Sequence, residues 1–299
     1  MRCWFQAIIA SSVLLLTFSC EGIDDISTDI EPDQEDAVSL DYSPIMSVSG
    51  NINPQPQGGD CWGDLFFQFV TGNSCVRVYD LSKKKLVQTI DIPYSQRGFV
   101  ANCHCNTACF GSQFYDEKDE FPLIYVSTGY ASKGYTGALV YRILRTDKKL
   151  SLSLVQTIRF PEDKSSWTEF VPAKDYAYLC YTTERVIYKV PVPKADSGDA
   201  IIDRSMAVET YQFTPQPEWM STSRNQDRLF YNGKIVFVSG VPLSGEASVF
   251  VVLNLEERTR EMTFDFKSIG LTKESESIFV WRDALCVAFL DQIVKLEFS

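Results

Sequence analysis

The sequence predicts an all-β fold made of five similar four-stranded units, the pattern of a five-bladed β-propeller. Three observations lead to this prediction. The segment Leu-Val-Gln-Thr-Ile occurs at residues 86–90 and again at residues 154–158. Each copy follows a strand-like run that contains a Val-Tyr pair, with a charged turn between the two. No convincing helical periodicity competes, and short strands repeating every few tens of residues indicate propeller blades.

The units can be placed along the chain from their second strands. These apolar, β-branched and aromatic runs begin at residues 65, 123, 176, 234 and 284, so successive units start 58, 53, 58 and 50 residues apart. Each unit is expected to carry one strand before this run and two after it, but the chain ends at Ser299 with the fifth unit one strand short. The β-prone segment Pro44–Gly50 precedes the first unit. We therefore expect this N-terminal strand to close the last blade, which removes an exposed sheet edge.

The first residues predict export. Arg2 is followed by a mostly apolar stretch from about Trp4 to Leu16, which is shorter than the roughly 20 residues of a membrane-spanning helix. This pattern is typical of a signal peptide, here residues 1–19. The stretch ends in Leu-Thr-Phe-Ser-Cys, which resembles the lipobox of bacterial lipoproteins, although its leucine lies one residue further from Cys20 than is usual. The resemblance implies that Cys20 becomes the acylated, palmitate-bearing N-terminus; an ordinary secretory peptide is the alternative.

Residues 20–42 predict a lipidated acidic tether. From Glu21 to Asp41 the chain carries nine acidic residues and no Lys or Arg, and such a charged segment with few aromatics does not form a packed core. Acidic residues directly after the lipid cysteine resemble the surface-export signal of Bacteroidetes lipoproteins, which implies a lipid-anchored protein exposed at the outer membrane. A plain solvated spacer is the alternative. The propeller domain is then expected to occupy residues 43–299.

The charge and the residue counts disfavour several classes of function. The formal net charge of −11 argues against nucleic acid as a partner and against membrane contact other than through the lipid, because nucleic acids and anionic lipids are bound by Lys- and Arg-rich surfaces. His104 is the only histidine, and no Gly-x-Ser-x-Gly segment accompanies it, which disfavours Ser-hydrolase chemistry. No phosphate loop, dinucleotide fingerprint or calcium loop occurs in the sequence, so no cofactor is expected.

The densest group of soft metal ligands is Cys103, His104, Cys105 and Cys109. On a strand, His104 would point away from its two cysteine neighbours, which is poor spacing for a tetrahedral zinc site. We therefore expect no metal, and interpret most cysteines as small buried hydrophobic residues.

The first two units resemble the repeats of YVTN-type and related quinoprotein-like propellers. The residues that carry this resemblance are the Val-x-Val-x-Asp strand at 76–80 and the Lys-rich turn at 82–85. The segments 104–111 and 119–127 are similar to a set of uncharacterised Bacteroidetes propeller lipoproteins. The resemblance covers roughly residues 57–299; it implies the propeller fold and no assured activity.

In a propeller, the innermost strand of each blade lines the central channel, and the flanking loops build the face where ligands bind. The innermost strands are expected at Asp60–Gly63, Asn106–Phe114, Thr168–Ala173, Asp227–Tyr231 and Ser277–Arg282. Residues at the entry to these strands are the candidate ligand-binding residues: Asp60, Trp62, His104, Asn106, Trp167, Glu169, Glu218, Trp219, Glu274 and Glu276. Exposed Trp faces suit the apolar face of a sugar, and carboxylates and Asn suit its hydroxyls. The alternative is that the Trp residues fill gaps between blades and the Glu residues are solvated loop ends.

These observations favour a non-catalytic binding lipoprotein, anchored at the outer membrane, that holds a glycan or a protein partner on one propeller face. The alternative is a glycan hydrolase or lyase, because two facing carboxylates suffice for glycoside hydrolysis. Glu169, Glu274 and Glu276 are the candidates for such a pair. Carboxyl groups separated by about 5 to 9.5 Å across an open pocket would favour the enzyme. No catalytic residue is assigned.

Overall fold

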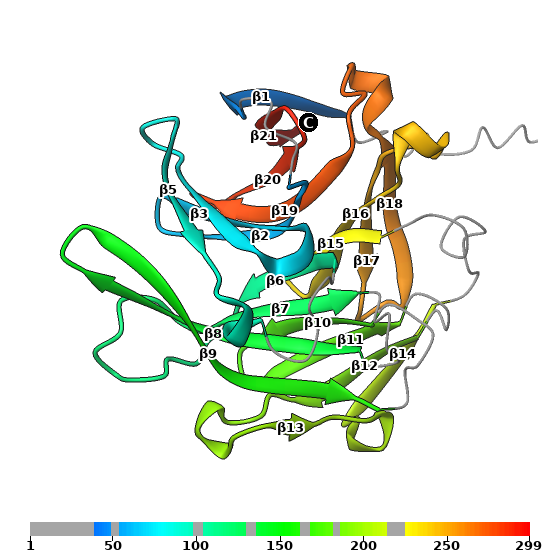
Figure 1. Ribbon diagram of the computed structural model, residues 1–299. Coiled ribbons are helices and arrows are strands. Elements are labelled where there is room, and N and C mark those ends of the chain that lie inside the picture. The colour runs from blue at the N-terminus through cyan, green and yellow to red at the C-terminus, as the bar shows by residue number, and fades with distance from the viewer. Residues whose placement is uncertain are drawn as a thin grey trace, which may run out of the picture. The chain divides into compact units, whose positions relative to one another are not determined.

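The computed structural model describes residues 39–48, 54–97, 104–129, 136–161, 168–181, 186–213 and 225–299. In these ranges the chain forms five β-sheets (Figure 1). The first strands of the five sheets contact one another around a common axis. The prediction of an all-β, five-bladed propeller whose last blade is closed by an N-terminal strand is confirmed.

Blades 1, 3 and 4 are four-stranded antiparallel sheets whose strands follow the chain order from the axis outward. Blade 1 consists of β2 (Pro56–Trp62), β3 (Leu65–Val70), β4 (Cys75–Asp80) and β5 (Lys85–Asp91). Blade 3 consists of β10 (Thr168–Ala173), β11 (Tyr176–Tyr181), β12 (Val186–Pro191) and β14 (Glu209–Gln212). Blade 4 consists of β15 (Asn225–Tyr231), β16 (Lys234–Ser239), β17 (Val249–Asn254) and β18 (Thr259–Asp265).

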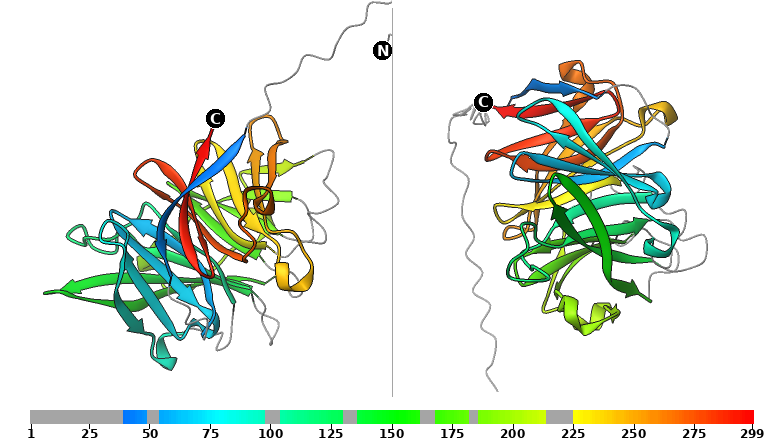
Figure 2. Two further views of the ribbon diagram at one scale, coloured as in Figure 1. Left: turned by 90° about the horizontal axis from the view of Figure 1, so that it is seen from above. Right: turned by 60° about the vertical axis from the view of Figure 1, so that its left-hand side comes forward.

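Blade 2 has a fifth strand and an unusually long outer hairpin. Its strands are β6 (His104–Phe110), β7 (Ile124–Gly129), β8 (Thr136–Thr146), β9 (Lys149–Phe160) and β13 (Ala200–Ile201). The β8–β9 hairpin projects well beyond β7 (Figure 2). The two-residue β13 comes from the blade 3 segment of the chain and pairs in parallel with β9, so it covers part of the outer edge of blade 2.

Blade 5 is closed by the N-terminal strand. Its strands are β19 (Ser275–Trp281), β20 (Ala284–Phe289), β21 (Gln292–Phe298) and β1 (Leu40–Ser47). Strand β1 pairs antiparallel with β21 from Leu40, opposite Phe298, to Ser47, opposite Gln292. The strand therefore begins at Leu40, three residues before the expected domain boundary at residue 43. Pairing both ends of the chain in one sheet makes the ring continuous.

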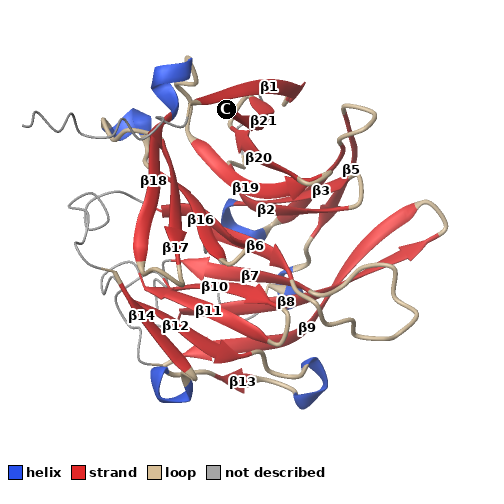
Figure 3. Ribbon diagram, turned by 180° about the vertical axis from the view of Figure 1, so that it is seen from behind, coloured by secondary structure: helices blue, strands red, loops and turns tan. Residues whose placement is uncertain are grey.

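Helical structure among the described residues is limited to short 3-10 turns (Figure 3). These turns are η1 (Thr71–Asn73), η2 (Tyr94–Gln96), η3 (Ala195–Ser197), η4 (Arg204–Met206), η6 (Pro242–Ser244) and η7 (Phe266–Ile269). In the described part of the chain, no helix has the length and apolar character needed to cross a membrane.

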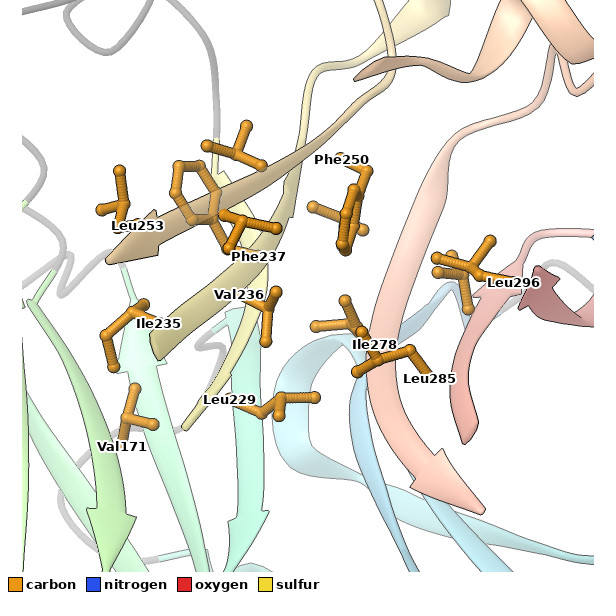
Figure 4. Close-up of a cluster of buried hydrophobic side chains, with 14 of the residues drawn as sticks. Val171, Leu229, Ile235, Val236, Phe237, Phe250, Leu253, Ile278, Leu285 and Leu296 are labelled. Atoms are coloured by element: carbon orange, nitrogen blue, oxygen red, sulfur yellow. The ribbon is translucent and has the colours of Figure 1, made fainter. Parts of the chain in front are cut away.

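The core lies between neighbouring blades rather than within one sheet. Val171 of blade 3, Ile235 of blade 4 and Ile278 of blade 5 belong to one buried cluster (Figure 4). A blade packed on both faces buries both sets of side chains, which explains strands such as β3, where five consecutive residues are buried. The continuous apolar runs of the sequence therefore reflect two packed faces.

The repeated Leu-Val-Gln-Thr-Ile segment makes the same kind of contact in both copies. Gln88 on β5 donates to the carbonyl of Leu150 (2.7 Å) and accepts from its amide (2.9 Å). Gln156 on β9 donates to the carbonyls of Lys194 (2.8 Å) and Gly198 (2.7 Å). In each case the fourth strand from the axis holds the backbone of a segment that comes from the next blade, so the repeat couples adjacent blades near their outer edges.

Candidate functional site

Polar side chains gather where the innermost strands of blades 5, 1 and 2 begin. Gln55 Nε2 donates to Glu276 Oε1 (3.0 Å), and Gln57 Nε2 lies 3.5 Å from Glu276 Oε2. The other end of the Gln57 amide, Oε1, lies 3.1 Å from His104 Nδ1. Because an amide oxygen only accepts, this arrangement places a proton on His104 Nδ1. Sequence analysis placed Glu276 and His104 at one site, and the structure joins them through Gln57.

Burial controls the charges in this cluster. Glu276 has no exposed surface, and burial together with the charge of Glu274 raises its pKa well above the usual range, while the bond from Gln55 acts in the opposite direction. Glu274 accepts a hydrogen bond from Gln226 Nε2 (2.5 Å). Burial lowers the pKa of His104. Burial thus favours the neutral forms of Glu276 and His104, and the Gln57 amide contacts both side chains.

Glu169 lies in a separate ion pair. Its carboxylate contacts the guanidinium of Arg228 on β15, and both side chains are almost fully buried. The guanidinium also lies over the ring of Phe237, 4.6 Å from its centroid. Burial raises the pKa of Glu169, and Arg228 opposes this shift. The pair joins blades 3 and 4 inside the protein, so Glu169 is not exposed at a loop end.

The axis is filled where blades 2 and 4 meet. Asn106 Nδ2 donates to the carbonyl of Asn225 (2.9 Å), and Cys109 Sγ donates to the carbonyl of Arg228 (3.0 Å). Strand β2 also approaches closely, because a Cβ added to Gly58 would lie 2.3 Å from the Asn106 carbonyl oxygen. The two hydrogen bonds join β6 and β15, which belong to blades that are not neighbours in the ring, so side chains fill the axis at this level.

Asp227 ties three innermost strands together. Its Oδ2 accepts from the amides of Gly59 on β2 (3.3 Å) and Ile278 on β19 (3.1 Å), and its Oδ1 accepts from the amide of Arg228 on its own strand (2.8 Å). Burial raises its pKa well above the usual range, the three backbone donors lower it, and the charge of Asp60 raises it further. The carboxyl group is a structural acceptor at the centre of the ring.

Asp60 and Trp62 lie further along β2 than Gln57, the residue of this strand that contacts His104, and Trp62 is the last residue of the strand. Asp60 Oδ2 accepts from the amide of Phe110 (2.8 Å), the last residue of β6, whereas Gln57 near the start of β2 contacts His104, the first residue of β6. The Trp62 ring packs against Phe110 with centroids 5.8 Å apart. Trp62 therefore does not lie with His104 at one end of the channel, because the two ends of a seven-residue strand are about 20 Å apart.

Trp62 also links two blades, as do aromatic residues that end other innermost strands. Its Nε1 donates to the carbonyl of Glu120 (3.2 Å) in blade 2. Trp281 Nε1 at the end of β19 donates to Asp64 Oδ1 (2.9 Å), which lies in blade 1. Trp62 thus contacts blade 2 while 39% of its surface stays exposed.

Three candidate binding residues and the lipidation site, namely Trp167, Glu218, Trp219 and Cys20, lie outside the described residues. Conversely, sequence analysis missed Gln55, Gln57, Gln226, Asp227 and Arg228. One signal could have found the first two: polar residues occur two positions apart at Gln55 and Gln57, as they do at Glu274 and Glu276, and this spacing places both side chains on one face of a strand.

An open pocket of about 390 Å³ lies at the same end of the propeller as the His104 cluster, beside the start of β19. Ser248, one of its lining residues, is 2.9 Å from Ser275, the first residue of β19 and the neighbour of Glu274 and Glu276. The pocket lies between the β16–β17 loop and the segment that leads from β18 to β19. Its lining residues are Pro242, Gly245, Glu246, Ala247, Ser248, Asp265, Lys267, Leu271 and Thr272.

The cysteines of the described ranges form no disulfide bonds with one another. Cys75, Cys105, Cys109, Cys180 and Cys286 are buried, which confirms that most of them serve as small core residues. Burial raises the pKa of Cys180 and of Cys286 to about 12, so these thiols stay protonated. Among the residues that the structure describes, no group of three or more His, Cys, Asp or Glu side chains is placed to hold a metal ion.

No family model and no curated protein matches this sequence. Solved structures do match its fold. Glutaminyl cyclase of Myxococcus xanthus aligns with a TM-score of 0.54 over 87% of this chain and 97% of its own, at 12% identity. The tail fibre of Staphylococcus aureus phage P68 aligns with a TM-score of 0.50 over 86% of this chain and 52% of its own, at 10% identity. At such low identity the likeness shows a shared fold alone.

Proposed function

We propose that this chain is an exported lipoprotein, anchored at the outer membrane through Cys20, whose propeller binds a glycan or a protein partner without converting it. The observation that carries the non-catalytic part is the state of the candidate carboxyl groups. Glu276 has no exposed surface and faces the amides of Gln55 and Gln57 with its two oxygens, and Glu169 is paired with Arg228. A glycosidase instead needs two carboxyl groups on either side of an accessible glycosidic bond.

The pocket beside β19 supports a binding role. Its volume of about 390 Å³ lies in the usual range for ligand pockets. Pro242, Ala247 and Leu271 supply apolar walls, and Asp265 and Thr272 supply polar groups. This mixture suits a sugar ring or a protein side chain that has both an apolar surface and hydrogen-bonding groups.

The anchor is inferred from the sequence. An apolar stretch typical of a signal peptide, the cysteine at position 20 and a run of acidic residues precede β1. Several acyl chains on one terminus hold a protein stably at a membrane, whereas one chain does so only marginally. An acidic, self-repelling segment between the lipid and β1 would keep the propeller away from the anionic membrane surface.

The proposal can be tested with the non-lipidated chain 21–299, which retains every described strand. Binding to an array of immobilised oligosaccharides is measured first, and the affinity for the strongest binder is then compared between the wild type and two variants. Thr272→Trp fills the pocket and should weaken binding at least about tenfold, as blocking a central contact does. Thr259→Trp, at an exposed position of β18, is the matched control and should leave the affinity unchanged.

The catalytic alternative predicts a different result. Burial beside Glu274 favours a protonated Glu276, the state that a general acid needs. If the bound oligosaccharide were shortened or converted to an unsaturated product, and Glu276→Gln abolished this turnover, the hydrolase or lyase hypothesis would replace the binding proposal. If Thr272→Trp leaves the affinity unchanged, the ligand does not bind in the pocket, and the pocket has no part in the binding proposal.

A further inference from the structure

We propose that the propeller carries a second binding site, for a saccharide, at the end opposite the pocket. The site is an aromatic platform formed by Trp62, Phe114 and Tyr115. Trp62 ends β2, and the other two residues lie in the loop between β6 and β7. This platform is separate from the pocket beside β19, so it adds to the proposed function rather than restating it.

All three side chains are exposed, and two of them are in direct contact. Trp62 is 39% exposed, Phe114 43% and Tyr115 47%. The Trp62 and Phe114 rings meet edge to face with centroids 6.2 Å apart, and Tyr115 follows Phe114 in the chain. Single exposed apolar side chains are ordinary, but a contiguous group of them marks an interaction surface.

The rings are held in place by the surrounding protein. Trp62 packs against Phe110 and donates its Nε1 proton to the carbonyl of Glu120. The guanidinium of Arg142 lies over the Tyr115 ring, 4.8 Å from its centroid. Two hydrogen bonds of 2.9 and 2.6 Å fix Arg142 to Asp119. Little conformational freedom would therefore be lost when a ligand binds, which favours affinity.

The loop that carries Phe114 and Tyr115 has its own backbone hydrogen bonds. The amide of Gly111 donates to Leu123 (2.9 Å), and the amide of Leu123 donates to Gln113 (2.8 Å). The amide of Asp119 donates to Asp116 (2.9 Å) across the tip of the loop. The aromatic side chains thus project from a braced loop, as a pre-organised binding surface requires.

The polar groups around the platform favour a saccharide over a protein. Asp116, Glu117 and Lys118 directly follow Tyr115 in the chain and are exposed. The loop therefore lacks the wide apolar surface from which the core of a protein interface excludes water. A pyranose offers an apolar C–H face to an aromatic ring and hydroxyl groups to charged side chains. The mixture of flat rings and charged hydrogen-bonding groups matches this chemistry.

The test uses the chain 21–299 and hexasaccharides of glucose, N-acetylglucosamine, mannose and galactose. Affinity is measured by calorimetry, and quenching of tryptophan fluorescence by acrylamide is recorded with and without sugar. At least one hexasaccharide should bind and reduce the quenching, because it covers Trp62. Phe114→Ala and Tyr115→Ala should each weaken this binding about tenfold. Both side chains are exposed, so thermal unfolding should confirm that the fold is intact.

Tyr94→Ala is the matched control, because Tyr94 is an exposed aromatic residue (73%) in η2, outside the platform; it should leave binding unchanged. The inference is overturned if none of the four hexasaccharides binds, or if binding is insensitive to Phe114→Ala and Tyr115→Ala. It is also overturned if the wild type sediments as a dimer that Phe114→Ala dissociates, since the platform would then be a contact between copies. Loss of binding with Thr272→Trp but not with Phe114→Ala would leave the proposed function standing and remove only this site.

Discussion

Replacing Asp60 with asparagine should remove a pH-dependent part of the stability of the propeller. The carboxyl group accepts from the amides of Phe110 and Cys61, and burial raises its pKa from 3.8 to about 6 despite these two bonds. The folded protein therefore binds this proton more tightly than the unfolded chain does. This stabilisation is complete below the unfolded pKa and is lost as the pH rises from about 4 to about 6.

The size of the effect follows from the shift. A difference of about two pKa units corresponds to about 3 kcal/mol of unfolding free energy, of which roughly 2 kcal/mol falls between pH 4 and pH 7. The charge of Asp60 also raises the pKa of Asp227. Removing this charge therefore reduces the contribution of Asp227 to the pH dependence of stability as well. Unfolding in urea at a series of pH values should show a steeper fall in stability toward pH 7 for the wild type than for Asp60→Asn.

Asp147→Asn serves as the control for this measurement. Asp147 lies exposed in the β8–β9 turn with φ at 56°, a conformation that asparagine also adopts readily, so this variant should follow the wild-type curve. Parallel curves for the wild type and Asp60→Asn between pH 4 and pH 7 would refute the reasoning, because they would mean that the Asp60 carboxyl titrates alike in the folded and unfolded states.

Two further outcomes are expected. Gln88→Ala should lower the unfolding free energy in urea by about 1 to 3 kcal/mol, because it leaves the amide and carbonyl of Leu150 without their partner; Thr89→Ala, an exposed neighbour on β5, is the control, and equal stability of the two variants would contradict the coupling between blades. Cells that produce Cys20→Ala should incorporate no radiolabelled palmitate into this protein, whereas the wild type should be labelled. Persistent labelling of the variant would show that Cys20 is not the lipid attachment site.

Much of the fold was predictable because the repeat is carried by strongly apolar strands. Four of the five second strands begin at the predicted residue, namely at Leu65, Tyr176, Lys234 and Ala284. The start of β2 was not predicted correctly, because the strand begins at Pro56 whereas the sequence indicated Asp60. Its first residues, Pro-Gln-Gly-Gly, have low β-propensity, and they form a strand because glycine lets β2 approach β6 more closely than any residue with a Cβ would.

Some residues of the candidate site could also be found from the sequence, and others could not. The polar residues at the start of β19 and His104 were found from their position in the repeat, and Gln57 connects them. Trp62 was assigned to the same group because it also lies in an innermost strand, β2. Sequence position along a strand of unknown start does not tell which end of the propeller a side chain reaches, and this is why Trp62 was placed at the wrong end.

The sequence by itself determined the number of blades and the strand that closes the ring, because β-prone runs at near-constant spacing leave a fifth unit that only an N-terminal strand can complete. It also determined that most cysteines are core residues. The tertiary structure alone decided that the axis is filled at Asn106 and Cys109 and that Glu169 and Glu276 are buried. These properties depend on how closely strands from different blades approach one another, and that distance is set by packing across the ring rather than by any local pattern.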